Sequence, residues 1–182
     1  MRRARWGKLS LAILLLVLVA AGVVPRLFDV ANPDVAWYAH LAERLLAGTD
    51  LYTEVREVNP PWPVWTMLPA AALAGALGLE TELVFNLMVV SLVLAVLAAV
   101  RRMLRGRRLS TVREREFLAT LALALLLVPG PAFGQREHLA VVLSLPYLLS
   151  LALRRRESVR RQLVLGVLAG FGFAFKPHFV LV

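Results

Sequence analysis

Basic residues are concentrated in three short clusters, and these clusters are separated by long apolar segments. Sixteen of the 21 Lys and Arg residues lie in them. The clusters consist of Arg2, Arg3, Arg5 and Lys8; of Arg101, Arg102, Arg105, Arg107, Arg108, Arg113 and Arg115; and of Arg154, Arg155, Arg156, Arg160 and Arg161. Two apolar segments separate each cluster from the next. If each segment crosses a membrane once, the chain returns to the same side between clusters, and all three clusters lie on that side. Since Lys and Arg collect on the cytoplasmic side, we predict that this side, with the N-terminus, faces the cytoplasm.

The apolar segments set the expected fold class. A helix that spans the hydrocarbon core needs about 20 mostly apolar residues. The segments closest to this requirement are residues 9–28, 82–100, 115–133, 139–153 and 163–182. Hydrophobic residues make up 59% of the chain, above the roughly 45–50% that is usual in soluble domains. We therefore predict an all-α integral membrane protein with about five transmembrane helices, forming a single membrane domain over residues 1–182.

Composition excludes several other classes of protein. The chain has no cysteine, which rules out disulfides, thiolate catalysis and Cys-ligated metals. The net charge of +9 would suggest nucleic acid binding in a soluble protein, but no such motif occurs and the topology accounts for the basic clusters. No nucleic acid partner is expected. Residues 9–28 follow a basic start as a signal peptide would, but the apolar run is long and ends in "PRLFDV" without a small-residue cleavage site.

Residues 29–81 form the long outer loop that this topology requires. Within it, "PDVAWYAHLAERLLAG" predicts an amphipathic juxtamembrane helix at about residues 34–47, because a Pro suits the first turn and a Gly ends the helix. A second helix is expected at about residues 62–79. That segment is apolar, but a full crossing would invert every later loop and expose 12 basic residues on the outer side. We therefore predict that it dips into the outer leaflet.

A few ionisable residues at the outer face are not required by topology, and they are the candidate site. Asp34 either serves its helix, whose first turn favours an acid, or acts as a general base. Arg136, Glu137 and His138 form either a local interfacial ion pair with a histidine or a site in which Arg136 holds a phosphate or carboxylate.

Three further residues belong with this group at the outer face. Lys176 either extends to the headgroups or binds phosphate beside the helix break at Pro177, with His178 next to it. Glu57 is either a solvated loop acid or a further contact of the site. Two histidines and several carboxylates on one side could hold a divalent cation, although no metal-ligand spacing supports one.

Three stretches in order resemble the amino-terminal half of GT-C-type integral membrane glycosyltransferases, near the aminoarabinose transferases and protein O-mannosyltransferases. They are "NPDVAWYAHLAERLLAGTDLYTEVREVNPPWPVW", "GQREHLAVVLSLPYLL" and "GFAFKPHF". The first looks like the family's first outer loop, in which an acid after proline is the catalytic base, here Asp34. The pattern departs from the family at Val35, where a second acid often stands, and at Asn59, which replaces a Lys. Glu137 takes the place of an Asp-containing turn.

The resemblance implies a polyprenyl-phosphate sugar donor in a bacterial cell membrane and an inverting transfer at the extracytoplasmic face. Asp34 would deprotonate the acceptor, and Arg136 and Lys176 would stabilise the leaving lipid phosphate. Family members are much longer, so the 182-residue chain is expected to be a fragment that is inactive without a C-terminal half or second chain. Two alternatives remain: a transporter or flippase-like subunit for an anionic lipid, and a non-catalytic membrane partner.

Overall fold

In the structure, a computed structural model, all the regular elements of the described residues are helices joined by turns and loops. The structure describes residues 13–14, 16–22, 24, 32–105, 110–153 and 158–176. The elements in order are α2 (Pro33–Leu46), α3 (Trp62–Leu77), α4 (Thr81–Leu104), α5 (Thr111–Leu126), the short 3-10 helix η2 (Gly130–Ala132), α6 (Arg136–Ala152) and α7 (Val159–Ala174). No strand occurs in these residues, and a single isolated bridge pairs Leu51 with Val55. The all-helical fold class is therefore confirmed.

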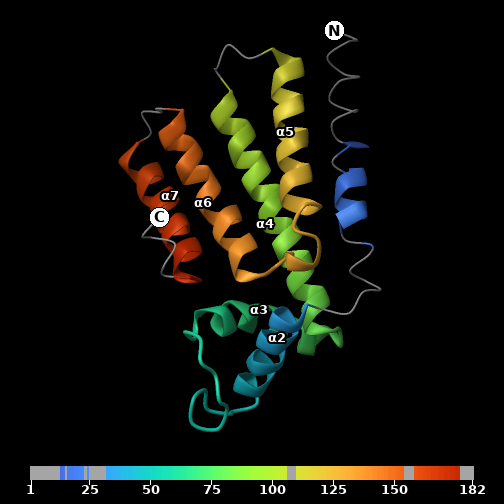
Figure 1. Ribbon diagram of the computed structural model, residues 1–182, viewed down its shortest axis with the longest axis vertical. Coiled ribbons are helices and arrows are strands. Elements are labelled where there is room, and N and C mark those ends of the chain that lie inside the picture. Colours follow the sequence, from blue (N-terminus) through green and yellow to red (C-terminus); the bar gives the residue numbers. More distant parts are fainter. Residues whose placement is uncertain are drawn as a thin grey trace.

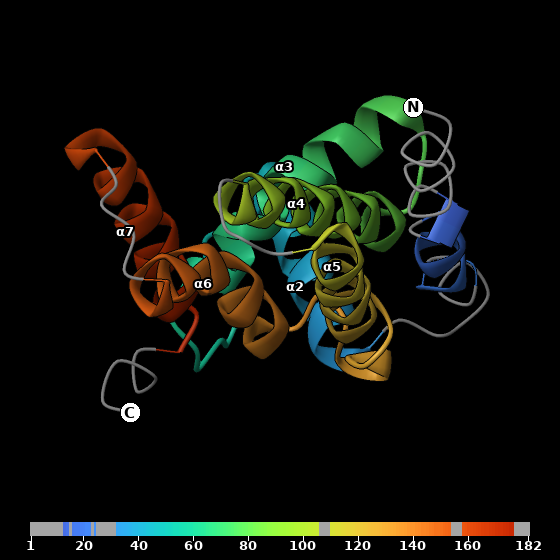
Figure 2. The same cartoon turned by 90° about the horizontal axis from the view of Figure 1, so that it is seen from above.

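The helices α4, α5, α6 and α7 run alternately up and down the long axis of the molecule (Figure 1). The helix α4 packs against α3, α5 and α6, and α7 packs on α6. Seen along the long axis, α7 lies at the outer edge of this group (Figure 2). The helices α2 and α3 cover one end, which we call the site end; it also carries the start of α6 and the end of α7. The opposite end, with the end of α4 and the starts of α5 and α7, is the arginine end.

The start and end of α2 follow from local chemistry. The side-chain oxygen of Asn32 accepts a hydrogen bond from the Asp34 N–H at 3.0 Å, which satisfies a donor that the first helical turn cannot pair. Pro33 has no N–H to lose at this position. After Leu46 the chain turns at Gly48, whose φ of 91° suits a residue without a Cβ. The helix lies within one residue of the predicted 34–47.

The helix α3 occupies the place predicted for the second outer helix. It begins at Trp62, as expected, and ends at Leu77, two residues before the predicted boundary. Gly78 follows with φ 66°, in the left-handed conformation that commonly ends a helix. Val64 and Met67 are fully buried, and the helix packs against both α2 and α4. The helices α2 and α3 thus form one packed layer across the site end.

Among the described residues, one helix is long and apolar enough to cross a membrane: α4, with 24 residues. Its length is about 36 Å at 1.5 Å per residue, enough for a hydrocarbon core of about 30 Å. The helices α5, α6 and α7 have 16, 17 and 16 residues, or about 24–26 Å. They lie where spans were predicted, but five crossings remain a prediction. The first predicted span, residues 9–28, falls largely outside the described residues.

The predicted helix over residues 115–133 needs correction. The helix α5 begins at Thr111, where the Ser110 side chain caps it by accepting from the Arg113 N–H, and it ends at Leu126. Pro129 and Gly130 interrupt it, since Pro cannot donate to the helix ladder and Gly130 has φ 48°. The chain then forms η2 and turns into α6. This turn places the start of α6 beside α2.

Candidate functional site

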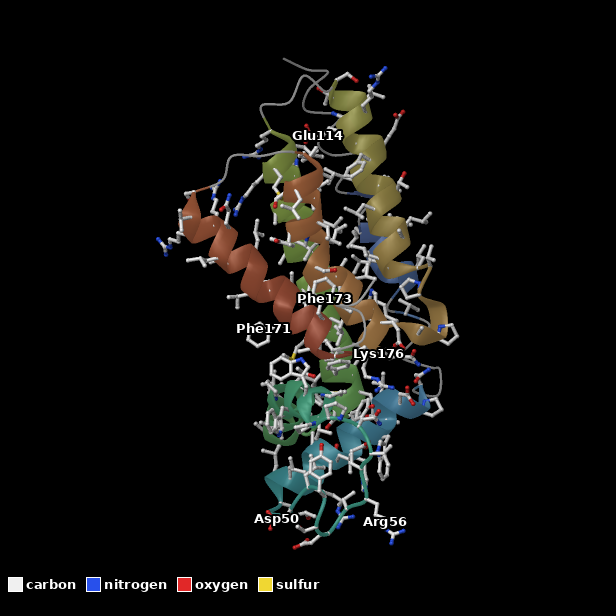
Figure 3. All side chains as sticks on the ribbon, turned by 60° about the vertical axis from the view of Figure 1, so that its left-hand side comes forward. Asp50, Arg56, Glu114, Phe171, Phe173 and Lys176 are labelled. Carbon is white, nitrogen blue, oxygen red and sulfur yellow. The ribbon has the colours of Figure 1, made fainter. Side chains whose placement is uncertain are left out.

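Four parts of the chain meet at the site end: the start of α2, the loop of residues 47–61, the start of α6 and the end of α7. Figure 3 shows Lys176 at this end and Glu114 at the arginine end, with Asp50 and Arg56 farther out in the loop. The ionisable residues that bring these parts together are Asp34, Glu57, Arg136, Glu137 and Lys176. All five were candidate site residues from the sequence.

Asp34 lies beside Arg136. The Asp34 carboxylate oxygen Oδ2 is 3.8 Å from Arg136 Nη2, and the two side chains are 54% and 18% exposed. Asn32 aligns the two elements, because its Nδ2 donates to the Pro131 carbonyl at 3.0 Å in the turn before α6. The same side chain caps α2 through its oxygen. Asp34 is thus accessible to solvent while a cation lies within ion-pair distance.

Arg136 is held by three different partners. Its Nη1 donates to the Asn59 side-chain oxygen at 2.9 Å, and its Nη2 faces Asp34. Its Cζ lies 5.7 Å from the centre of the Tyr38 ring, within the range of cation–π attraction. Its Nε is buried and has no hydrogen-bond partner in the part of the chain that the structure describes. A ligand cannot reach this buried N–H, so an anion would meet the guanidinium at its Nη atoms, one of which faces Asp34.

Glu57 is fully engaged inside the loop. Its Oε1 accepts from both the backbone N–H and the side-chain Nδ2 of Asn59, each at 2.7 Å. Its Oε2 accepts from Trp37 Nε1 at 2.6 Å. Burial alone would raise the pKa of Glu57, but the hydrogen bonds from Asn59 and Trp37 outweigh burial and hold this pKa below its ordinary value. The geometry therefore favours a role in holding the loop over the predicted contact with phosphate.

Lys176 forms an ion pair with Glu137 through its Nζ. The lysine follows the end of α7, where its backbone N–H donates to the Phe173 carbonyl at 3.1 Å. Glu137 lies in the first turn of α6, directly after Arg136. The pair therefore brings the end of α7 to the start of α6, next to the residue that contacts Asp34. Pro177 and His178, another candidate, lie outside the described residues.

His138 has a structural environment, contrary to its candidate role in binding. The residue is 6% exposed. Its Nδ1 accepts from the Gly134 N–H at 3.0 Å, and its Nε2 lies 2.9 Å from the Leu125 carbonyl. Because a carbonyl only accepts, Nε2 carries the proton in this arrangement. The imidazole thus joins the end of α5 to the turn before α6. The sequence alone did not show whether His138 is buried or exposed.

An aromatic contact between α3 and α7 was not anticipated. The Trp62 ring stacks on Phe171, with centroids 5.0 Å apart and planes inclined by 12°, and it also lies near Phe175. Trp62 Nε1 donates to the Phe171 carbonyl at 3.3 Å. No local pattern in the sequence indicates this contact, because Trp62 and Phe171 are 109 positions apart in the chain.

The described residues contain no group of three or more His, Asp or Glu side chains that could hold a metal ion. The proposed divalent cation therefore has no ligand set in that part of the chain. No protein-family model matches the sequence, and neither the curated proteins nor the solved structures include a match. The resemblance to GT-C glycosyltransferases stays a prediction that rests on the three stretches of sequence.

Proposed function

We propose that the protein is the N-terminal part of an integral membrane glycosyltransferase. It transfers a sugar from a polyprenyl-phosphate donor to an acceptor at the extracytoplasmic face, with inversion at the anomeric carbon. The single observation that supports this most is the position of Asp34 at 3.8 Å from Arg136, with the Lys176–Glu137 pair following directly along α6. A base and two cations are the groups that such a transfer needs.

The proposed topology has five crossings and a cytoplasmic N-terminus in a bacterial cell membrane. The distribution of charge supports it, because seven of the ten described arginines lie at the arginine end, while the candidate site lies at the other end. The described arginines of that end are Arg101, Arg102, Arg105, Arg113, Arg115, Arg160 and Arg161. By the positive-inside rule this end faces the cytoplasm, and the site faces outward, where a lipid-linked donor in the outer leaflet reaches it.

In the proposed reaction, Asp34 takes the proton from an acceptor hydroxyl. The acceptor oxygen forms a bond to the anomeric carbon while the bond from that carbon to the phosphate oxygen breaks. The lipid phosphate leaves with the electron pair. A positioned base contributes about 10²–10⁴-fold to such a step, and the half-exposed carboxylate of Asp34 is open to an acceptor.

Arg136 and Lys176 stabilise the departing phosphate, where negative charge develops. Each cation faces a carboxylate, Asp34 or Glu137. The phosphate takes over both cations when it binds, and this releases Asp34 to act as a base. Binding of the phosphate to these two cations is the property to measure on the 182-residue chain.

Binding of farnesyl phosphate, a short polyprenyl monophosphate, tests the proposal on the detergent-purified chain. We expect Arg136→Gln and Lys176→Gln each to weaken binding about tenfold to a hundredfold, because a hydrogen bond to a charged group contributes roughly 1.5–3 kcal/mol. Asp34→Asn removes a competing carboxylate and should not weaken binding. Farnesol, which lacks the phosphate, is the control ligand, and Arg101→Gln at the arginine end is the control variant. Equal affinity for farnesol and farnesyl phosphate would overturn the proposal.

A further inference from the structure

A continuous series of hydrogen bonds leads from Trp37 through the loop to Arg136. Trp37 donates to Glu57, Glu57 accepts twice from Asn59, and Asn59 accepts from Arg136. Asn59 and Arg136 are 77 positions apart in the chain. The series is therefore a tertiary contact between the loop and the start of α6, and it ends on the cation that faces Asp34.

The chemistry of the Asn59 amide gives this series a fixed direction. An amide has one accepting oxygen and one donating nitrogen. In the structure the nitrogen faces the carboxylate of Glu57, which can only accept, and the oxygen faces the guanidinium of Arg136, which can only donate. A reversed amide would set oxygen against carboxylate and nitrogen against guanidinium. Glu57 therefore favours the orientation in which Asn59 presents its oxygen to Arg136.

Glu57 can do this only as a carboxylate. Both of its oxygens accept, one from Asn59 and the other from Trp37. A glutamine in its place would turn an N–H toward one of these donors. Glu57 is 9% exposed, so water cannot readily relieve the mismatch, and a buried donor left unpaired is costly.

We propose that Glu57 is a positioning residue for Arg136, acting through Asn59. Glu57 fixes the amide of Asn59, and the amide oxygen then holds Arg136 Nη1 so that Nη2 stays toward Asp34. The consequence for ligand binding rests on the proposed function, in which Arg136 contacts the donor phosphate. The positioning itself rests only on the contacts of these residues.

Chemical modification of arginine tests the positioning without any ligand. Phenylglyoxal reacts with guanidinium groups, and peptide mass spectrometry gives a rate for each arginine. We expect Glu57→Gln to raise the rate at Arg136 about threefold to tenfold, in line with coupling energies between residues of one hydrogen-bond network. The rate at Arg101, which pairs with Glu114 at the arginine end, should not change, and this control shows that the effect is confined to the site end.

Removing Asn59 separates positioning from a general loss of structure. Asn59→Ala should raise the Arg136 rate by a similar factor, and Glu57→Gln should then add no further increase. Equal increases from Glu57→Gln in the presence and absence of Asn59 would overturn the proposal. An unchanged Arg136 rate in Glu57→Gln would overturn it as well.

Farnesyl phosphate then distinguishes the two proposals. If the wild type binds it, Glu57→Gln should weaken binding several-fold, although Glu57 itself does not contact the phosphate, and the effect should vanish in the Asn59→Ala background. If the wild type binds farnesyl phosphate no better than farnesol, the proposed function fails, while the modification rates still decide whether Glu57 positions Arg136.

Discussion

Two carboxylates of the site end differ in how their oxygens are used. Glu57 accepts three hydrogen bonds from N–H groups and is buried. Asp34 is half exposed and has a looser ion pair with Arg136. A fully hydrogen-bonded carboxylate resists protonation, which suits a structural role. Asp34, in contrast, stays accessible to solvent, as a general base must be.

Glu57 should make stability depend on pH in the acidic range. Its pKa in the folded protein lies below the ordinary value of 4.5, so the unfolded chain binds this proton more tightly. Its contribution to stability is therefore complete above about pH 4.5 and is lost as the pH falls through the folded-state pKa. We expect thermal unfolding to show a difference between the wild type and Glu57→Gln that is largest at neutral pH and shrinks below pH 4.5.

Glu54→Gln is the matched control for this measurement, because Glu54 is an exposed acid of the same loop. Its unfolding profile should follow that of the wild type. If the unfolding temperatures of the wild type and Glu57→Gln instead differ by the same amount at pH 7 and at pH 3, that result would contradict a lowered pKa of Glu57 in the folded protein.

At the level of elements, the contact of α6 with α7 decides where Lys176 lies. The two helices approach closely at Gly172, where an added Cβ would lie 3.0 Å from the Ala140 carbonyl oxygen. The α7 backbone must therefore keep a residue without a side chain at this position. Lys176 follows four residues later and pairs with Glu137 on the neighbouring helix.

Gly172→Ala should separate α6 from α7 and lower the free energy of unfolding by about 1–3 kcal/mol, as overpacking usually does. Gly170→Ala, two residues away, is the control because an added Cβ meets nothing within 4 Å there. It should be neutral or stabilise by about 0.5–1 kcal/mol, since Ala favours a helix over Gly. Chemical denaturation in detergent measures both, and equal effects of the two changes would contradict the close contact.

The sequence predicted elements better than contacts between them. The Asn-Pro-Asp start of α2 and the glycines that end α2 and α3 are local signals, and both helices lie within two residues of their predicted bounds. The hydrogen bond from Arg136 to Asn59 joins positions 77 residues apart, and no local pattern reveals it. The burial of His138 depends on Gly134 and Leu125 around it, so its polar neighbours in sequence suggested exposure instead.

At the level of the whole molecule, the two ends carry different charges. Seven of the ten described arginines flank the end of α4 and the starts of α5 and α7, whereas most of the described acids lie around α2, the following loop and the start of α4. In a membrane protein such a separation sets the orientation, because Lys and Arg collect on the cytoplasmic side, and it therefore supports the proposed topology.

The natural absence of cysteine makes this orientation directly measurable. Thr53→Cys labels the loop at the site end, and Val112→Cys labels an exposed position at the arginine end. In intact cells, a membrane-impermeant maleimide should modify only the Thr53→Cys variant. After the cells are opened, both variants should react, and modification of the Val112→Cys variant in intact cells would contradict the proposed topology.

The first turn of α6 has a mechanical consequence for the two cations. Arg136 and Glu137 are consecutive, and one faces α2 while the other holds Lys176 on α7. Neighbouring helical residues point about 100° apart, so a small rotation of α6 about its axis changes both ion pairs at once. A ligand that draws Arg136 away from Asp34 by turning α6 would therefore also change the distance between Glu137 and Lys176.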